Sequence, residues 1–374
     1  MKTQPLEINM PINAVLRTMG LKIAFPCLAF LLVMPVPAHA ANYVGWALAD
    51  QPDASDTYTA NPKYSFNSAG GSVSVVIGTT PGNYAVYFQN LANSGPVNVQ
   101  VSGYNTSGWC TSTGQASQSG TALAGVQCYN AQGQPARASF TLLYQARNAP
   151  FGGATSGEAY FFDNDPAQKT NTPPDQSFNS TGGNNMVAAS SIGNYTGTLP
   201  GLTKPGGEPQ VTAIQLSSAI PRCKLATWST GASSTSVNVH CYDITGKPKN
   251  GGFFVAYSVG QPLGAIPGFV PLGAWAWANV PESTAIYKPV GKYQYNGFKT
   301  GPLTAQKTGT GLYTVTIPGT ISYGTSVALV TAQGADNRYC NLAGWTTNAI
   351  NIACFAQGGT PADSKFEVSF QTAN

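Results

Sequence analysis

The stretch CNLAGWTTNAINIACFAQGGTPADSKFEVSF, from Cys340 to Phe370, decides the fold because the chain contains three versions of it. A second copy, CKLATWSTGASSTSVNVHCYDITGKPKNGGFFVAY, covers 223–257, and a weaker copy covers 110–144. Counted from the second cysteine of each copy, four residues recur at the same offsets: Gly133, Gly246 and Gly359; Pro135, Pro248 and Pro361; Phe140, Phe253 and Phe366; and Tyr144, Tyr257 and Phe370. Shared offsets of this kind indicate internal structural repeats, and the glycines suit a turn that needs positive φ.

The region before each cysteine pair repeats as well. Pro52, Pro166 and Pro281 align, and each is preceded by an aromatic residue and a short polar residue. The aromatic column consists of Trp46, Tyr160 and Trp275, and the polar column consists of Asp50, Asn164 and Asn279. The two regions together define repeats at about 41–150, 151–268 and 269–374, which we expect to form one all-β domain.

Composition and patterning predict strands throughout the mature chain and no helix. β-Branched and aromatic residues favour strands, and abundant glycine, proline and asparagine favour tight turns. Each repeat divides into two related halves of four predicted strands, and an aromatic residue opens the last strand of each half. These aromatic residues are Tyr84, Phe140, Tyr195, Phe253, Tyr313 and Phe366. Six four-stranded units of about 55 residues each are what a six-bladed β-propeller requires.

A second architecture fits the repeat lengths equally well, namely three tandem eight-stranded β-sandwiches. The connections at 145–157 and 258–272 do not resemble charged, flexible linkers between domains, which favours the propeller. Stacking the sheets around an axis would also bury both faces of each one. The six-bladed propeller is therefore the first expectation, and the tandem sandwiches are the alternative.

Residues 1–40 predict a signal peptide rather than part of the fold. Arg17 and Lys22 supply a basic region, an apolar run covers 23–36, and Ala38-His39-Ala40 is a small-residue cleavage site. The run is too short to span a membrane, and nothing after it is long and apolar enough to do so. We expect cleavage after Ala40, no transmembrane segment in the mature chain, and export to the periplasm or the extracellular space.

The cysteines predict three disulfide bonds. Six of the seven cysteines follow residue 40, two in each repeat, so pairing within the repeats is the simplest connectivity. The expected bonds are Cys110–Cys128, Cys223–Cys241 and Cys340–Cys354, and such bonds persist in exported proteins. The chain has no C-x-x-C motif, and its mature part has a single histidine, His240, so no zinc site is expected.

Charge and motifs argue against nucleic-acid binding and catalysis. Charged residues make up 9% of the chain and its net charge is +4, with no basic run of the kind that binds nucleic acid. The G-x-S-x-G motif is absent, and a Ser-His-Asp arrangement would have to use His240, which is expected on a strand surface. No pair of acidic residues recurs at equivalent positions of the three repeats. We expect no catalytic residues, no metal and no cofactor.

The two columns point to carbohydrate binding. A sugar ring stacks its C–H face on an aromatic side chain, and its hydroxyls hydrogen-bond to Asn or Asp. The candidate sites pair Trp46 with Asp50, Tyr160 with Asn164, and Trp275 with Asn279. The alternative is that the aromatic residues pack between sheets while the polar residues cap turns.

Two further tryptophans occupy equivalent positions. Trp228 and Trp345 each stand five residues after the first cysteine of a pair, and we expect them in hairpin cores. The first repeat has Gln115 at this position.

The first functional expectation is a secreted, non-catalytic binding protein for glycans or other cell-surface polymers. One alternative is a structural or surface-interaction protein without a small ligand. The other is an extracellular glycoside hydrolase, which would need a pair of carboxylates.

Overall fold

The computed structural model describes residues 42–91, 95–147, 156–164, 174–215, 222–265, 272–319 and 324–373. The expected signal peptide lies outside these residues. The described residues form strands and two single-turn 3-10 helices, η1 (Pro62–Tyr64) and η2 (Gly291–Tyr293), which confirms the predicted all-β class. None of their helices is long and apolar enough to cross a membrane.

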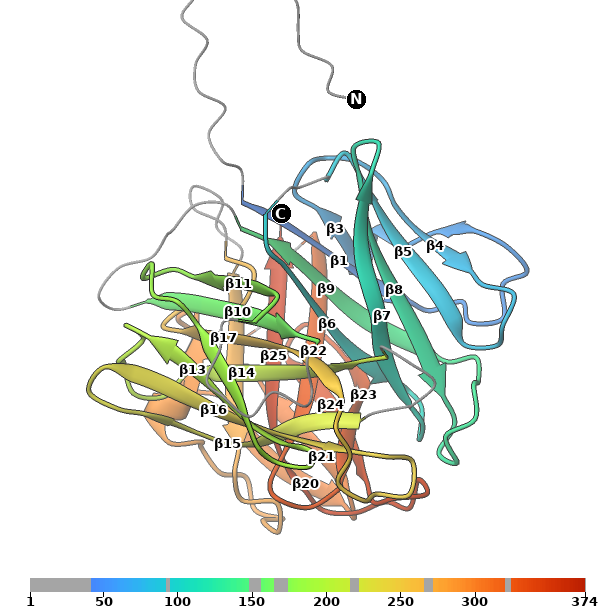
Figure 1. Ribbon diagram of the computed structural model, residues 1–374. Helices are drawn as coiled ribbons and strands as arrows, with labels where there is room; N and C mark the ends of the chain where they lie inside the picture. The colour runs from blue at the N-terminus through green and yellow to red at the C-terminus, as the bar shows by residue number, and fades with distance from the viewer. Residues whose placement is uncertain are drawn as a thin grey trace, which may run out of the picture. The chain divides into compact units, whose positions relative to one another are not determined.

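The strands follow the three repeats along the chain (Figure 1). The first repeat contains β1 (Tyr43–Ala49), β2 (Tyr58–Thr59), β3 (Ser65–Asn67), β4 (Val73–Ile77), β5 (Asn83–Gln89), β6 (Val97–Tyr104), β7 (Trp109–Gln118), β8 (Thr121–Tyr129) and β9 (Ser139–Ala146). The second contains β10 (Gly157–Asp163), β11 (Gln176–Asn179), β12 (Met186–Ser191), β13 (Asn194–Pro200), β14 (Glu208–Ile214), β15 (Arg222–Thr230), β16 (Ser234–Tyr242) and β17 (Gly252–Val259). The third contains β18 (Leu272–Ala278), β19 (Gln294–Asn296), β20 (Thr304–Gly309), β21 (Leu312–Thr316), β22 (Thr325–Gln333), β23 (Tyr339–Trp345), β24 (Ala349–Phe355) and β25 (Lys365–Ala373).

Each repeat forms two antiparallel layers. We call one the inner layer, and its strand orders are β3-β1-β9-β6, β11-β10-β17-β14 and β19-β18-β25-β22 in the three repeats. The outer layers are β4-β5-β8-β7, extended at its edge by β2, then β12-β13-β16-β15 and β20-β21-β24-β23. The four-stranded units are thus composed differently from the expected halves, because the first and last strands of each repeat pair with one another, as β18 does with β25.

The two layers of a repeat enclose a core of its own. The aromatic residues that open the last strand of each half face one another across this core in three equivalent pairs. Their ring centroids are 5.2 Å apart for Tyr84 and Phe140, 4.8 Å for Tyr195 and Phe253, and 5.1 Å for Tyr313 and Phe366. Each tyrosine hydroxyl also accepts a hydrogen bond from a backbone N–H just before the partner strand.

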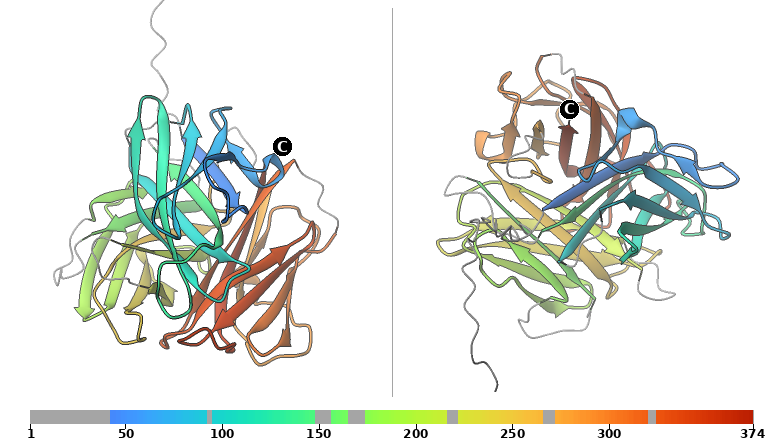
Figure 2. Two further views of the ribbon diagram at one scale, coloured as in Figure 1. Left: turned by 90° about the vertical axis from the view of Figure 1, so that its right-hand side faces the viewer. Right: turned by 90° about the horizontal axis from the view of Figure 1, so that it is seen from above.

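Three parallel junctions join the repeats into a ring. β6 meets β23 at Tyr104 and Leu342, β7 meets β14 at Ser112 and Ile214, and β15 meets β22 at Leu225 and Gln333. Each junction links the outer layer of one repeat to the inner layer of the next, which gives sheets of eight, nine and eight strands. No sheet of described residues closes on itself, and each of the three sheets contains strands of two repeats. Seen from above, the repeats form three groups of strands, coloured blue to teal, green to yellow and orange to red (Figure 2).

Hydroxyl groups fasten these junctions in cyclic order. Ser102 Oγ accepts a hydrogen bond from the backbone N–H of Val330 at 2.9 Å. Thr212 Oγ1 accepts the N–H of Val101 at 2.9 Å, and Thr331 Oγ1 donates to the carbonyl oxygen of Val211 at 3.5 Å. The three hydroxyl residues occupy equivalent positions, so the repeats are related by a pseudo-threefold axis.

The inner layers are buried on both faces. Strands β9, β17 and β25 are buried along almost their whole length, whereas the outer strand β13 alternates between buried and half-buried residues. The second face of the inner layers packs in a central cluster to which all three repeats contribute, including Trp46, Tyr160 and Leu329. Burial of this face is what the association of the repeats provides.

All three predicted disulfide bonds are confirmed. Each joins residues that lie directly opposite one another on neighbouring strands of an outer layer. The turns that follow carry Gly133, Gly246 and Gly359 at φ values of 78°, 79° and 83°, which is the conformation expected of them.

The hydroxyl at Thr212 provides a test of the junctions. We expect Thr212→Val to lower the free energy of unfolding by about 1–3 kcal/mol, since the buried N–H of Val101 loses its acceptor and no apolar contact is lost. Urea unfolding followed by circular dichroism measures the change. Thr227→Val, at an exposed position of β15, is the matched control; equal stability of the two variants would contradict the role given to Thr212.

Removal of the third repeat tests the ring. A chain ending before Gly273 lacks the partners of β6 and β15 and uncovers the central faces of the first two repeats. We therefore expect it to lose cooperative thermal unfolding. A native-like cooperative melt of the shortened chain would show instead that the repeats fold independently.

Candidate functional site

The structure places the predicted aromatic column inside the protein. Trp46 and Tyr160 are 0% exposed, and Trp275 is 2% exposed. Each donates a hydrogen bond to the preceding repeat of the ring: Trp46 to Thr325 Oγ1 at 3.2 Å, Tyr160 to the carbonyl oxygen of Pro96 at 2.8 Å, and Trp275 to that of Gln261 at 3.1 Å. The three rings are buried where one repeat packs against another, so they offer no face on which a sugar could stack.

The polar column lies apart from these rings. Asp50, Asn164 and Asn279 directly follow β1, β10 and β18, each four residues beyond its aromatic partner. Four residues of extended chain span about 13 Å. Asn164 is exposed and donates its backbone N–H to Asp175 Oδ2 at 2.9 Å, while Asp50 and Asn279 are half-buried. The structure therefore does not assemble the three predicted aromatic–polar sites.

An aromatic groove lies on the surface where the third repeat meets the first. We call it the Trp345 groove; it has a volume of about 300 Å³ and is lined by Lys63, Tyr64, Ser326, Trp345, Thr346, Thr347, Phe370 and Thr372. The rings of Trp345 and Tyr64 meet edge to face, with centroids 5.4 Å apart at 83°. The Lys63 ammonium lies 5.5 Å from the centre of the Tyr64 ring.

A second groove of the same kind lies where the second repeat meets the third. This Trp228 groove has a volume of about 180 Å³ and is lined by Pro205, Gly206, Trp228, Ser229, Thr230, Lys292 and Tyr293. Trp228 and Tyr293 meet edge to face at 5.7 Å and 84°. The Lys292 ammonium lies 4.9 Å from the centre of the Tyr293 ring.

The two grooves are built from equivalent parts of the chain. In each, the tryptophan lies near the end of a strand that carries a disulfide cysteine, and the Lys-Tyr pair lies in a 3-10 turn of the next repeat in the ring. A β-bulge precedes each tryptophan, between Leu225 and Thr227 and between Leu342 and Gly344. Bulges increase the local twist and re-aim side chains, which accounts for the position of both indoles at the boundary.

Hydrogen bonds hold the η1 turn and both indoles in place. Asn61 Oδ1 accepts the backbone N–H of Lys63 at 3.0 Å, and Pro62 at the start of η1 fixes the turn that presents Tyr64. The Trp345 N–H donates to Ser326 Oγ and the Trp228 N–H donates to the Gly206 carbonyl oxygen, each at 3.1 Å. The indole N–H groups are therefore engaged within the protein, so a ligand would contact the exposed part of each ring.

The third boundary, between the first and second repeats, lacks these aromatic residues. Gln115 replaces the tryptophan, and Asp175-Gln176 replaces the Lys-Tyr pair. The Gln176 Oε1 atom accepts the backbone N–H of Val97 at 2.8 Å. Because the tryptophan and the Lys-Tyr pair are both absent from one boundary and both present at the other two, they form a unit.

The chemistry of the grooves is that of a binding surface. Aromatic faces, threonine and serine hydroxyls and one lysine line each groove, and no carboxylate is among the lining residues. Trp228 and Trp345, which the sequence assigned to hairpin cores, are half-buried, and one side of each packs on the core of its repeat. The signal for these sites was the Lys-Tyr pair shared by the first and third repeats.

Three glutamates are instead buried between the repeats. Glu158, Glu208 and Glu367 are each 0% exposed. Glu158 pairs with Arg147, at 3.2 Å between Oε1 and Nε, whereas neither carboxyl oxygen of Glu367 has a hydrogen-bond partner. Burial raises the pKa of Glu208 to about 8, and burial together with the charge of Glu208 holds the pKa of Glu367 well above its usual range.

The sequence predicted neither a catalytic histidine nor a metal site. His240 is half-buried, with Nδ1 3.3 Å from the hydroxyl of Tyr242. The part of the chain that the structure describes contains no group of His, Cys, Asp and Glu residues suited to a metal ion. No family model, curated protein or solved structure matches the chain. The two grooves are therefore the features that bear on function.

The buried glutamates predict a pH dependence of stability. The folded state keeps the proton of Glu208 up to a pH of about 8, whereas the unfolded chain releases it above about 4.3. The stabilisation is complete below that lower value and is lost as pH rises towards 8, so we expect the free energy of unfolding to fall between pH 5 and pH 8.

Urea unfolding across this range measures the effect. Glu208→Gln combined with Glu367→Gln should flatten the dependence, whereas Glu282→Gln, an exposed acid, should leave it unchanged. An equally steep dependence in the double variant would contradict the assignment.

Proposed function

We propose that the protein is a non-catalytic glycan-binding protein whose sites are the Trp345 and Trp228 grooves. The observation that carries the proposal is the duplication of one aromatic, lysine and hydroxyl arrangement at two equivalent boundaries. Packing between the repeats does not require this arrangement, because the third boundary forms its parallel junction without it. The duplication is therefore better explained by a ligand than by the fold.

The groove chemistry matches a sugar polymer. The half-buried faces of Trp345 and Tyr64, and of Trp228 and Tyr293, supply apolar area for the C–H faces of sugar rings. The hydroxyls of Thr347 and Ser229 would exchange hydrogen bonds with sugar hydroxyls, whereas those of Thr346 and Thr230 already have partners within the protein. Each direct bond replaces one to water and adds little net affinity, so single sites should be weak.

Two equivalent sites on one body would act together on a repeating glycan. Binding at the second groove becomes intramolecular once the first is filled, and such coupling raises avidity by roughly 10²–10⁴ where the geometry allows both to engage. The three disulfide bonds are compatible with export, where cell-surface polymers would be met. The proposed function is thus the expected one, glycan binding, but its sites are the two grooves and not the aromatic and polar columns.

Catalysis is not part of the proposal. A glycoside hydrolase needs two carboxylates beside the scissile bond, and the residues lining the two grooves include none. Glu158, Glu208 and Glu367 are closed off between the repeats.

A structural or surface-interaction protein is the second candidate. The observations that favour it are the burial of the aromatic column and three exposed apolar side chains, Val280, Ile286 and Val290, in the segment between β18 and η2. Such a protein would need no glycan, so binding measurements separate the two functions.

The test is a glycan array followed by calorimetry with Trp345→Ala, Trp228→Ala and the double variant. We expect each single change to reduce binding of a polymeric glycan by roughly 10²-fold or more, since avidity is lost, and the double change to abolish it. Gln115→Ala, at the equivalent position of the third boundary, is the matched control and should bind as the wild type does. Circular dichroism must show that each variant is folded.

Two outcomes would contradict the proposal. A folded double variant that binds the same glycans with unchanged affinity would remove the grooves from the function. A wild-type protein that binds no glycan on the array would leave the structural or surface-interaction function in the lead.

A further inference from the structure

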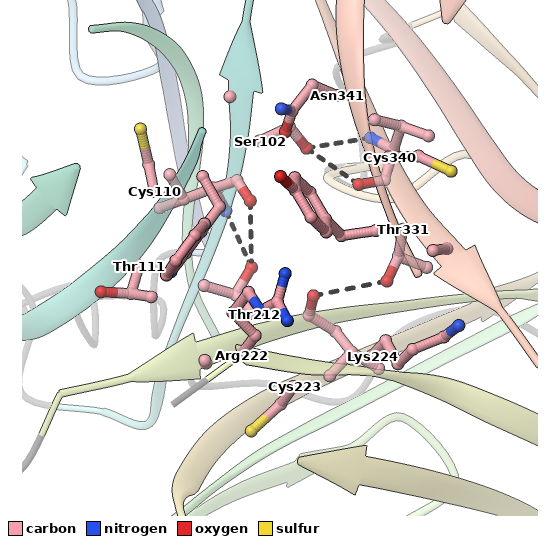
Figure 3. A pocket seen from close by; sticks show the side chains of 18 residues that line it. Ser102, Cys110, Thr111, Thr212, Arg222, Cys223, Lys224, Thr331, Cys340 and Asn341 are labelled. Atoms are coloured by element: carbon pink, nitrogen blue, oxygen red, sulfur yellow. Dashed lines mark hydrogen bonds between the residues drawn. The ribbon is translucent and has the colours of Figure 1, made fainter. Parts of the chain in front are cut away.

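A small cavity lies on the pseudo-threefold axis where the three junctions meet. It has a volume of about 60 Å³, and each repeat contributes the same six positions to its lining (Figure 3). The hydroxyls of Ser102, Thr212 and Thr331 are among these positions. They are already engaged with the backbone of the neighbouring repeats, at Val330, Val101 and Val211.

A buried arginine projects into this cavity. Arg222, from the start of β15, is 6% exposed, and Trp109 and Tyr339 hold the equivalent positions in the other two repeats. The guanidinium carbon lies 4.8 Å from the ring centre of Trp109 and 4.7 Å from that of Tyr339. The two rings therefore flank the cation, and a cation between aromatic faces is favourable when it is desolvated.

Two of the three nitrogens of the Arg222 guanidinium have no hydrogen-bond partner in the protein. The Nη2 atom of Arg222 donates to Gln357 Oε1, but its Nε and Nη1 atoms are buried and have no hydrogen-bond partner. The indole nitrogen of Trp109 is also buried without a partner. Three N–H bearing nitrogens at the axis thus lack acceptors, and leaving such groups unsatisfied is costly.

The charge of Arg222 also lacks a paired carboxylate. Among the described residues Arg222 makes no salt bridge, although Lys224, which lines the same cavity, pairs with Asp336 at 2.7 Å. A buried cation needs a counter-charge or strong acceptors. The cavity beside Arg222 exceeds the roughly 10–15 Å³ that one water requires, so it has room for a small ion.

We propose that this cavity is a binding site for a small monovalent anion of halide size. The ion would accept hydrogen bonds from Arg222 and Trp109 and neutralise the guanidinium. Because these two residues come from different repeats, the bound ion would fasten the ring at its axis. This site is separate from the two grooves and does not depend on glycan binding.

The test uses bromide and chloride with the full-length mature protein. Anomalous diffraction from crystals grown in sodium bromide should show a bromide ion within hydrogen-bond distance of Arg222. In solution, Tm should rise saturably with chloride when ionic strength is held constant with the bulky morpholinoethanesulfonate anion, as ligand linkage requires.

Arg222→Met removes the charge and keeps most of the apolar volume. We expect it to weaken the chloride response at least about tenfold, since charge-assisted hydrogen bonds are lost. Arg137→Met, a change at an exposed arginine, should keep the wild-type response. If Arg222→Met fails to fold, the bromide position in wild-type crystals decides the question. Wild-type crystals without bromide at the axis, or a Tm that responds equally to chloride and to the sulfonate, would overturn the proposal.

Discussion

The structure depends on burying the second face of each inner layer. A four-stranded layer can cover one face with its own outer layer, but the other face needs a partner. In this chain that partner is the other two repeats. The donors on Trp46, Tyr160 and Trp275 then fix how the layers meet, because each reaches one acceptor on the preceding repeat of the ring. Apolar area drives the contact, and the three directed hydrogen bonds specify its register.

The proposed binding surfaces follow from the same ring. Two boundaries bring an outer strand of one repeat against the 3-10 turn of the next, and Gln115 with Asp175-Gln176 hold the equivalent positions at the third boundary. Trp345 with Tyr64 and Trp228 with Tyr293 lie at the first two. At the third, the side chain of Gln176 binds the backbone at Val97. The equivalent positions at a boundary therefore hold either a proposed ligand site or an additional contact between repeats.

The features that could be predicted from the sequence are those that residues close together in the chain determine. Matched offsets identified the disulfide pairs, and the positive φ of Gly133 follows from its place in a hairpin turn. The pairing of β18 with β25 was missed, because repeat offsets show which residues are equivalent and not which strands are neighbours. The burial of Trp46 was only the alternative expectation, for a related reason. An outward-facing aromatic residue has the same pattern whether another repeat or solvent lies against it.

The axis shows what a single chain gains over three identical subunits. In a symmetric trimer, the residue beside the axis is the same three times, and three arginines there would repel one another at close range. Covalent linkage of the repeats allows Trp109, Arg222 and Tyr339 to differ, so that two rings flank one cation. The outer boundaries differ in the same way, with two aromatic grooves and one position without them. Equivalent backbone positions with unequal side chains thus let one repeated scaffold hold distinct sites, at its centre and at its surface.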